Sequence, residues 1–114
     1  MKPIPLSLLN MSATLYPYAG VDGYGKPTFG TAVSLSQVYI ENTKSVSLGS
    51  LGEVQAGSIT LFFDAVNSLP VGTSFTTLDK IVYDGSTLFV REATKYNDPK
   101  TGTLHHWEVT LRGN

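Results

Sequence analysis

The sequence predicts a mainly β protein, a small antiparallel β-barrel with long loops and at most one short helical turn. Three observations support this prediction. Apolar and polar residues alternate along several segments with the period of two that is typical of strands. Glycine, proline, asparagine and aspartate gather between these segments and predict tight turns. The length of 114 residues suits one domain, so we expect residues 1–114 to form a single barrel.

The first half of the chain contains three predicted strands with clear alternation or β-branched and aromatic residues. They are Ser12 to Tyr18, Val33 to Glu41 and Ser58 to Phe63. Alternation places side chains two residues apart on the same face of a strand. We therefore expect one face to carry Val33, Leu35 and Tyr39 in the second strand, and Ile59, Leu61 and Phe63 in the third.

The C-terminal third predicts a three-stranded meander. Strands Lys80 to Tyr83 and Ser86 to Ala93 are separated by Asp84-Gly85, a pair that favours the type I′ turn of a tight hairpin. A longer loop over Asn97 to Gly102 follows, in which Pro99 and Gly102 suit turn positions. The last strand, Leu104 to Arg112, is expected to carry on one face His105, Trp107, Val109 and Leu111.

Two segments are not clear strands. Asp64 to Ser68 predicts one helical turn, capped by Asp64 and ended ahead of Pro70. Lys44 to Gly57 carries two charges, three glycines and four aliphatic residues, namely Val46, Leu48, Leu51 and Val54. It is either a long loop with a functional role or a glycine-rich hairpin that turns at Gly49-Ser50. The sequence leaves both alternatives open.

Composition excludes several classes of function. Eight basic and nine acidic residues are spread along the chain and form no basic patch, so we do not expect tight binding of DNA. Zero cysteines exclude disulfides and thiolate metal sites. We find no signal peptide and no stretch near the roughly 20 apolar residues that cross a membrane. Few charges mean little repulsion between copies, which favours self-association.

Two motifs resemble binding sites but lack essential parts. Gly20 to Lys26 fits most of a phosphate-binding loop, yet Pro27 follows where a serine or threonine would hold magnesium. His105-His106 near Glu108 invites a metal site, but neighbouring residues on a strand point to opposite faces. We expect no metal there, with His106 on a polar face near Glu108 and His105 packed beside Trp107. No cofactor is expected.

Catalytic machinery is also not supported. Carboxylates that could form an acid–base pair are Asp64, Asp79, Asp84, Glu92, Asp98 and Glu108. The turns already account for Asp84 and Asp98, and the predicted cap accounts for Asp64. No G-x-S-x-G nucleophile motif is present. We expect no catalytic residue and no enzyme.

Short stretches extend over nearly the whole chain in an order and spacing that carry a family resemblance. They are Pro3–Asn10, Ser12–Leu15, Leu35–Glu41, Leu61–Ser68, Asp79–Gly85 and Leu104–Val109. Together they resemble the minor capsid proteins of phages and prophages of Gram-positive bacteria. The resemblance implies a head-completion or stopper protein, a small β-barrel that forms a ring below the portal, between head and tail.

Under that hypothesis the partners are other copies of the chain in the ring, portal or adaptor proteins, and tail proteins. DNA would pass through the ring without specific binding, and no membrane is involved. We expect the protein at the head–tail interface of the virion, and in the bacterial host cytoplasm during assembly. The assembly segment would be Lys44 to Gly57, through Val46, Leu48, Leu51 and Val54. The alternative is a stand-alone barrel that binds a small ligand in a pocket lined by Tyr16, Tyr18, Tyr24 or Trp107.

Overall fold

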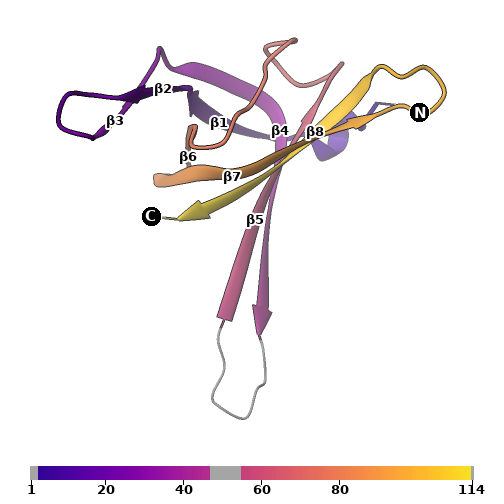
Figure 1. The fold of residues 1–114 in the computed structure, drawn as a ribbon. Coiled ribbons are helices and arrows are strands. Elements are labelled where there is room, and N and C mark those ends of the chain that lie inside the picture. Colours follow the sequence, from indigo (N-terminus) through magenta and orange to yellow (C-terminus); the bar gives the residue numbers. More distant parts are fainter. Residues whose placement is uncertain (1–2, 47–54, 114) are drawn as a thin grey trace.

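Antiparallel strands close into a barrel in the order β1-β4-β5-β8-β7-β6 (Figure 1). This computed structural model describes residues 3–46 and 55–113, with side chains described for 3–41 and 59–113. The barrel strands are β1 (Met11–Tyr16), β4 (Val33–Val46), β5 (Gln55–Asp64), β6 (Lys80–Tyr83), β7 (Ser86–Asn97) and β8 (Leu104–Gly113). A separate hairpin of β2 (Tyr18–Val21) and β3 (Pro27–Phe29) lies at one side, and a 3₁₀ helix, η1, spans Leu6–Leu8.

Pairing between the first strand and β6 closes the barrel. The register joins Thr14 to Val82, Leu15 to Ile81 and Tyr16 to Lys80. Closure removes the open edges that a flat sheet would present to other chains. The predicted mainly β barrel is therefore confirmed. No helix among the described residues is long and apolar enough to cross a membrane.

The core is filled by alternate residues of each strand, as the alternation predicts. Leu61 and Phe63 of β5 are 0% and 1% exposed, and Trp107 of β8 is 5% exposed. Phe75, in the loop between β5 and β6, joins them, since its ring packs edge-on against Phe63 and Trp107 with both centroid distances 5.5 Å. The core as a whole consists of Ala13, Leu15, Leu35, Val38, Ile40, Leu61, Phe63, Phe75, Ile81, Leu88, Val90, Trp107, Val109 and Leu111.

The face predicted for Tyr39 is wrong, because a β-bulge interrupts β4. Gln37 has a φ of 56°, and the register with β1 shifts so that Met11 opposes Val38 while Ser12 opposes Ser36. One extra residue reverses the side-chain alternation beyond it. Val38 and Ile40 therefore point into the core, and Tyr39 stands on the outer face instead of beside Leu35.

The C-terminal meander is confirmed. Asp84 and Gly85 have φ angles of 50° and 78°, as a type I′ turn requires, and Tyr83 pairs with Ser86 across the turn. Gly102, with a φ of 74°, closes the next loop by donating its N–H to the Asp98 carbonyl at 2.8 Å. The sheet therefore runs β6-β7-β8, and β8 continues onto β5.

The segment 64–68, predicted to form one helical turn, forms a hydrogen-bonded turn that is not part of a helix. The helical turn of the described chain is the 3₁₀ helix η1. Asp64 does cap the turn, because its Oδ2 accepts the N–H groups of Val66 and Asn67 at 3.0 and 2.8 Å. In the segment 44–57, both flanks are strand: Lys44, Ser45 and Val46 pair with Gly57, Ala56 and Gln55. These pairs favour the hairpin alternative over a structureless loop.

Candidate assembly surfaces

The hairpin of β4 and β5 projects from the barrel as a two-stranded ribbon (Figure 1). β1 pairs with β4 only as far as Val38, and β8 pairs with β5 only from Ile59 onward. From Thr43 to Val46 and from Gln55 to Ser58, the two strands pair only with each other in the described part of the chain. Each outer edge of this ribbon therefore has no strand partner among the described residues.

This ribbon belongs to the segment predicted to mediate assembly. Val46 is the last residue of β4, and its side chain lies outside the described ones. Leu48, Leu51 and Val54 also lie outside the described residues. The part that these four side chains play in assembly stays a prediction.

The hairpin of β2 and β3, which we call the arm, contains the phosphate-loop-like sequence. Its tip is closed by Asp22, whose Oδ1 accepts the N–H groups of Tyr24 and Lys26 at 2.8 and 3.0 Å. The Asp22 N–H in turn donates to the Lys26 carbonyl at 2.8 Å. A carboxylate therefore occupies the amides that a phosphate would need, which agrees with the rejection of nucleotide binding. Tyr24 at the tip is 91% exposed.

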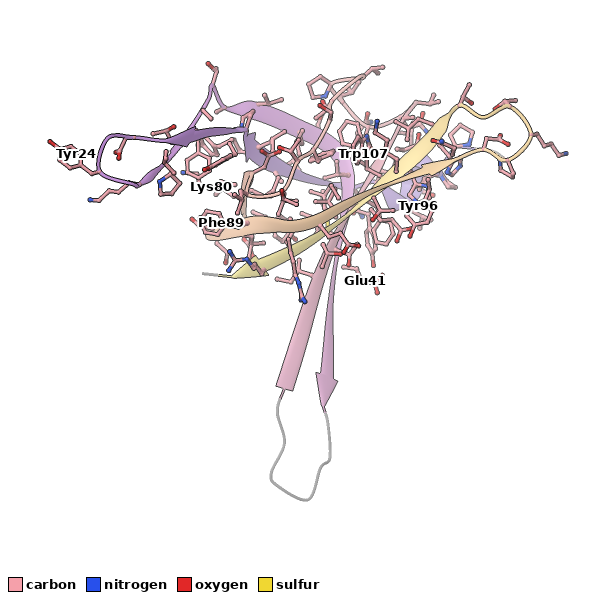
Figure 2. All side chains as sticks on the ribbon, in the orientation of Figure 1. Tyr24, Glu41, Lys80, Phe89, Tyr96 and Trp107 are labelled. Atoms are coloured by element: carbon pink, nitrogen blue, oxygen red, sulfur yellow. The ribbon has the colours of Figure 1, made fainter. Side chains whose placement is uncertain are left out.

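The base of the arm is fixed to the barrel (Figure 2). The Lys80 Nζ lies 4.5 Å from the ring centroid of Tyr16 and 4.7 Å from that of Phe29, so one cation contacts rings from β1 and β3. The Tyr18 N–H donates to Oδ1 of the buried Asp79 at 2.8 Å. These contacts orient the arm relative to the barrel.

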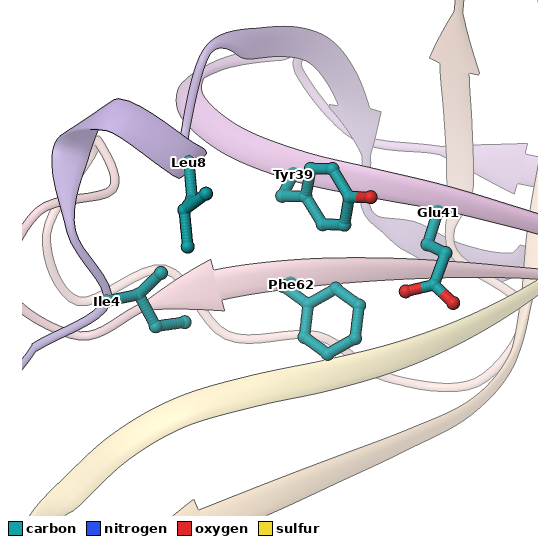
Figure 3. Close-up of a pocket in the computed structure, with 5 residues that line it drawn as sticks. All are labelled: Ile4, Leu8, Tyr39, Glu41 and Phe62. Carbon is teal, nitrogen blue, oxygen red and sulfur yellow. The ribbon is translucent and has the colours of Figure 1, made fainter.

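A mainly apolar groove lies between η1 and the strands β4 and β5 (Figure 3). It has a volume of about 360 Å³ and is lined by Ile4, Leu8, Tyr39 and Phe62, with Glu41 at its edge as the one charged lining residue among those described. Leu8 is 57% exposed. The rings of Tyr39 on β4 and Phe62 on β5 contact each other, with 5.8 Å between their centroids. Sequence reasoning missed this groove, although the run of aliphatic residues in Pro3–Asn10 was a signal for it.

Asp64 holds the N-terminal wall of the groove. Its buried Oδ1 accepts the Ile4 N–H at 2.9 Å, and the Asn67 side-chain amide donates to the Ile4 carbonyl at 2.8 Å. The carboxylate therefore joins the N-terminal segment to the turn that follows β5. Asp79 acts similarly near the arm, where it accepts two hydrogen bonds from Thr76 at 2.9 Å each. Both carboxylates are acceptors within the fold and do not form an acid–base pair.

The side chains of His105 and His106 contact each other, so the prediction that they point to opposite faces is wrong. His106 Nε2 contacts Glu108 Oε2 at 2.9 Å, as expected, but its Nδ1 lies 2.7 Å from Nδ1 of His105. The reason is an irregularity at the end of β7, where Tyr96 pairs with His106 and Asn97 pairs with Leu104. His105 is the extra residue there, so strand alternation does not fix its direction. Among the described residues, no three or more His, Asp or Glu side chains are arranged so that they could hold one metal ion.

The residues predicted for a ligand pocket do not all gather at one place, although Tyr16 and Tyr18 both lie near Phe29 at the base of the arm. Trp107 lines a surface cleft of about 300 Å³ beside Phe63 and Lys95. Tyr18 lines a different cleft, with Phe29 and Arg112, and Tyr24 stands at the tip of the arm. Tyr18, Tyr24 and Trp107 therefore do not line one common pocket, and binding of a small ligand by any of them stays a prediction.

Comparisons with known proteins identify the family. A model of the minor capsid protein family matches residues 5–111. The fold is similar to that of the phage-like element PBSX protein xkdH from Bacillus subtilis, with a TM-score of 0.52 and 17% sequence identity over 91% of this chain and 93% of that one. None of the curated proteins compared with the chain matches it. Because the family model spans the barrel from before β1 into the last residues of β8, this chain belongs to the minor capsid protein family.

Proposed function

We propose that this protein is a subunit of the head–tail connector of a tailed phage and acts by assembling into a ring below the portal. As a member of the minor capsid family it is a phage structural protein and a component of the virion. Membership of a structural family favours a role without catalysis. Its partners would be further copies of itself, the portal or adaptor protein above and a tail protein below.

The projecting β4–β5 ribbon is the observation that carries this proposal. A two-stranded ribbon is at best marginally stable in water, because few contacts offset the entropy lost by ordering it. Its backbone between Thr43 and Val46 extends beyond the strands of its own barrel. Strand pairing with a neighbouring subunit would satisfy the outer edges and bury side chains at the contact. In a ring, every copy would gain this stabilisation.

The charge of the chain suits a ring through which DNA passes. A formal net charge of −1 offers little attraction to phosphates, so DNA would be neither held tightly nor strongly repelled. A DNA-binding subunit would instead need a concentrated basic surface. We therefore assign the ring a structural role in conducting or retaining DNA.

The test is to replace residues 44–57 with a short Gly-Ser bridge and to measure two quantities. We expect the melting temperature to change little, because the pairs of β4 with β1 and of β5 with β8 lie outside the deleted part. We also expect no infectious particles when this variant is supplied to a phage that lacks the protein. Full complementation would contradict the proposed role of the segment, and a large thermal destabilisation would show that it belongs to the barrel's own core.

A further inference from the structure

Tyr24 is an exposed aromatic side chain on a turn that hydrogen bonds hold closed. Its side chain is 91% exposed although the backbone around it is closed by two hydrogen bonds to Asp22. Because little of its surface is buried, the ring adds little packing stabilisation to the monomer. Tyrosine offers a large amphipathic contact area at an interface, and with the backbone of the tip already fixed, docking would cost mainly the entropy of its side chain. The arm therefore exposes Tyr24 where a partner could contact it.

The groove has the chemistry to receive that ring. Its walls are the aliphatic side chains of Ile4 and Leu8 and the aromatic rings of Tyr39 and Phe62 (Figure 3). A volume of about 360 Å³ is enough for one aromatic side chain. The groove lies open on the protein surface, and Leu8 in its wall is more than half exposed. Burying such a patch against an aromatic residue removes apolar surface of both from water.

The charges next to the two features are complementary. Lys26 is two residues from Tyr24 and is exposed at the tip of the arm. Glu41 is exposed beside the groove, next to the ring of Tyr39 (Figure 3). When Tyr24 enters the groove, Lys26 can approach Glu41, and opposite charges at the rim of an interface favour the correct orientation.

The positions of the two features suit contact between neighbouring copies. The arm extends at one side of the barrel, whereas η1 lies toward the other side (Figure 1), and Leu8 of η1 lines the groove. Tyr24 and Glu41 are likewise well separated in Figure 2. An interface between two different surfaces of the same chain is heterologous, and repeating it generates a closed ring when the rotation allows closure.

We infer that the arm tip of one copy docks in the groove of the next, with Tyr24 among Ile4, Leu8, Tyr39 and Phe62 and with Lys26 beside Glu41. This inference rests on the proposed ring and names a contact that would build it. The occupant of the groove is therefore a second copy of this chain. The contact lies on the barrel and the arm, and is separate from the projecting ribbon.

Cysteine cross-linking tests the contact directly, because the chain has no cysteine of its own. The variant Lys26→Cys with Glu41→Cys keeps Tyr24 and the apolar walls of the groove. It is produced in a phage that lacks the native protein, and purified particles are treated with a short bifunctional maleimide, which bridges thiols farther apart than the Cα separation of about 7 Å that a disulfide allows. We expect a ladder of dimers, trimers and larger species on a denaturing gel. The matched control pairs Lys26→Cys with Val66→Cys, a residue that is 62% exposed outside the groove, and should give no ladder.

The outcomes separate this inference from the proposed function. Particles that contain the double variant but yield no ladder would overturn the docking and leave the connector role standing. Particles that never contain the protein, native or variant, would overturn the connector role and the docking with it. A ladder of equal strength in the Val66→Cys control would also overturn the docking, because the cross-link would then not depend on the groove.

Exchanging the charges of Lys26 and Glu41 provides an independent test of the contact. Lys26→Glu and Glu41→Lys, each alone, place like charges at the contact and are expected to lower the titre of infectious particles about tenfold or more. The double variant restores opposite charges and is expected to recover most of the titre. Melting temperatures of the purified variants check that each is folded. Single variants that match the parent titre, or a double variant no better than the singles, would refute the pairing of Lys26 with Glu41.

Discussion

Replacing Asp64 with alanine is expected to lower the stability of the barrel sharply. The carboxylate is fully buried and accepts three backbone N–H groups, from Ile4 at 2.9 Å, Val66 at 3.0 Å and Asn67 at 2.8 Å. Alanine would leave these three partly buried donors without their acceptor. The N-terminal segment would also lose a main attachment to the barrel, because Ile4 is tied to the turn through Asp64.

The magnitude follows from the three hydrogen bonds. A hydrogen bond to a charged acceptor contributes about 1.5–3 kcal/mol, and bonds that share one acceptor group do not add fully. We therefore expect the free energy of unfolding to fall by about 3–5 kcal/mol. For a domain near this size, 1 kcal/mol shifts the melting temperature by about 4–8 °C, so the expected loss is more than about 10 °C.

The matched control is Asp22→Ala, at the tip of the arm. Asp22 also accepts two backbone N–H groups, at 2.8 and 3.0 Å, but it is exposed, so water can replace it. We expect this variant to lose less than about 1 kcal/mol. Thermal unfolding followed by circular dichroism compares the two. If Asp64→Ala melts within about 3 °C of Asp22→Ala, burial does not strengthen these bonds as argued.

Two further predictions concern the C-terminal meander. Gly85→Val should cost about 1 kcal/mol or more, because a β-branched residue tolerates positive φ poorly, and no atom lies within 4 Å of an added Cβ to supply another cause. Gly23→Val, with equally open space and no positive φ, is the control, and equal melting of the two variants would show that the strain argument is wrong. Zinc titration by calorimetry should detect no stoichiometric micromolar binding at His105 and His106, and such binding to the monomer would refute the prediction of no metal site.

Local patterns in the sequence predicted the parts of the fold that depend on neighbouring residues. Asp84-Gly85 determines its own turn, since positive φ at both positions is a local property. The alternation of Ile59, Leu61 and Phe63 gives the correct buried face because no bulge interrupts it. The face of Tyr39 could not be predicted in this way, because the bulge at Gln37 is stabilised by distant groups. Ser68 Oγ donates to the Gln37 carbonyl, and Ser36 pairs with Leu69.

The candidate contact surfaces were only partly predictable for the same reason. The composition of the segment 44–57 was enough to single it out. The length of the ribbon that carries it could not be predicted, because that length depends on where β1 and β8 stop pairing with β4 and β5. The groove brings together Ile4 and Phe62, which are far apart in the chain, through the buried carboxylate of Asp64. In the sequence, a buried aspartate that accepts several N–H groups cannot be told from an aspartate in an exposed turn. The two differ only in the folded structure.

The most direct test of the connector role is to locate the protein in purified particles. Heads and tails are separated, and quantitative mass spectrometry measures the copy number of the protein relative to the portal protein in each fraction. A ring below the portal predicts that the protein is found at the head–tail junction, with a copy number of the same order as the portal protein. Its absence from the particles, or a copy number comparable to that of the major shell protein, would contradict the account.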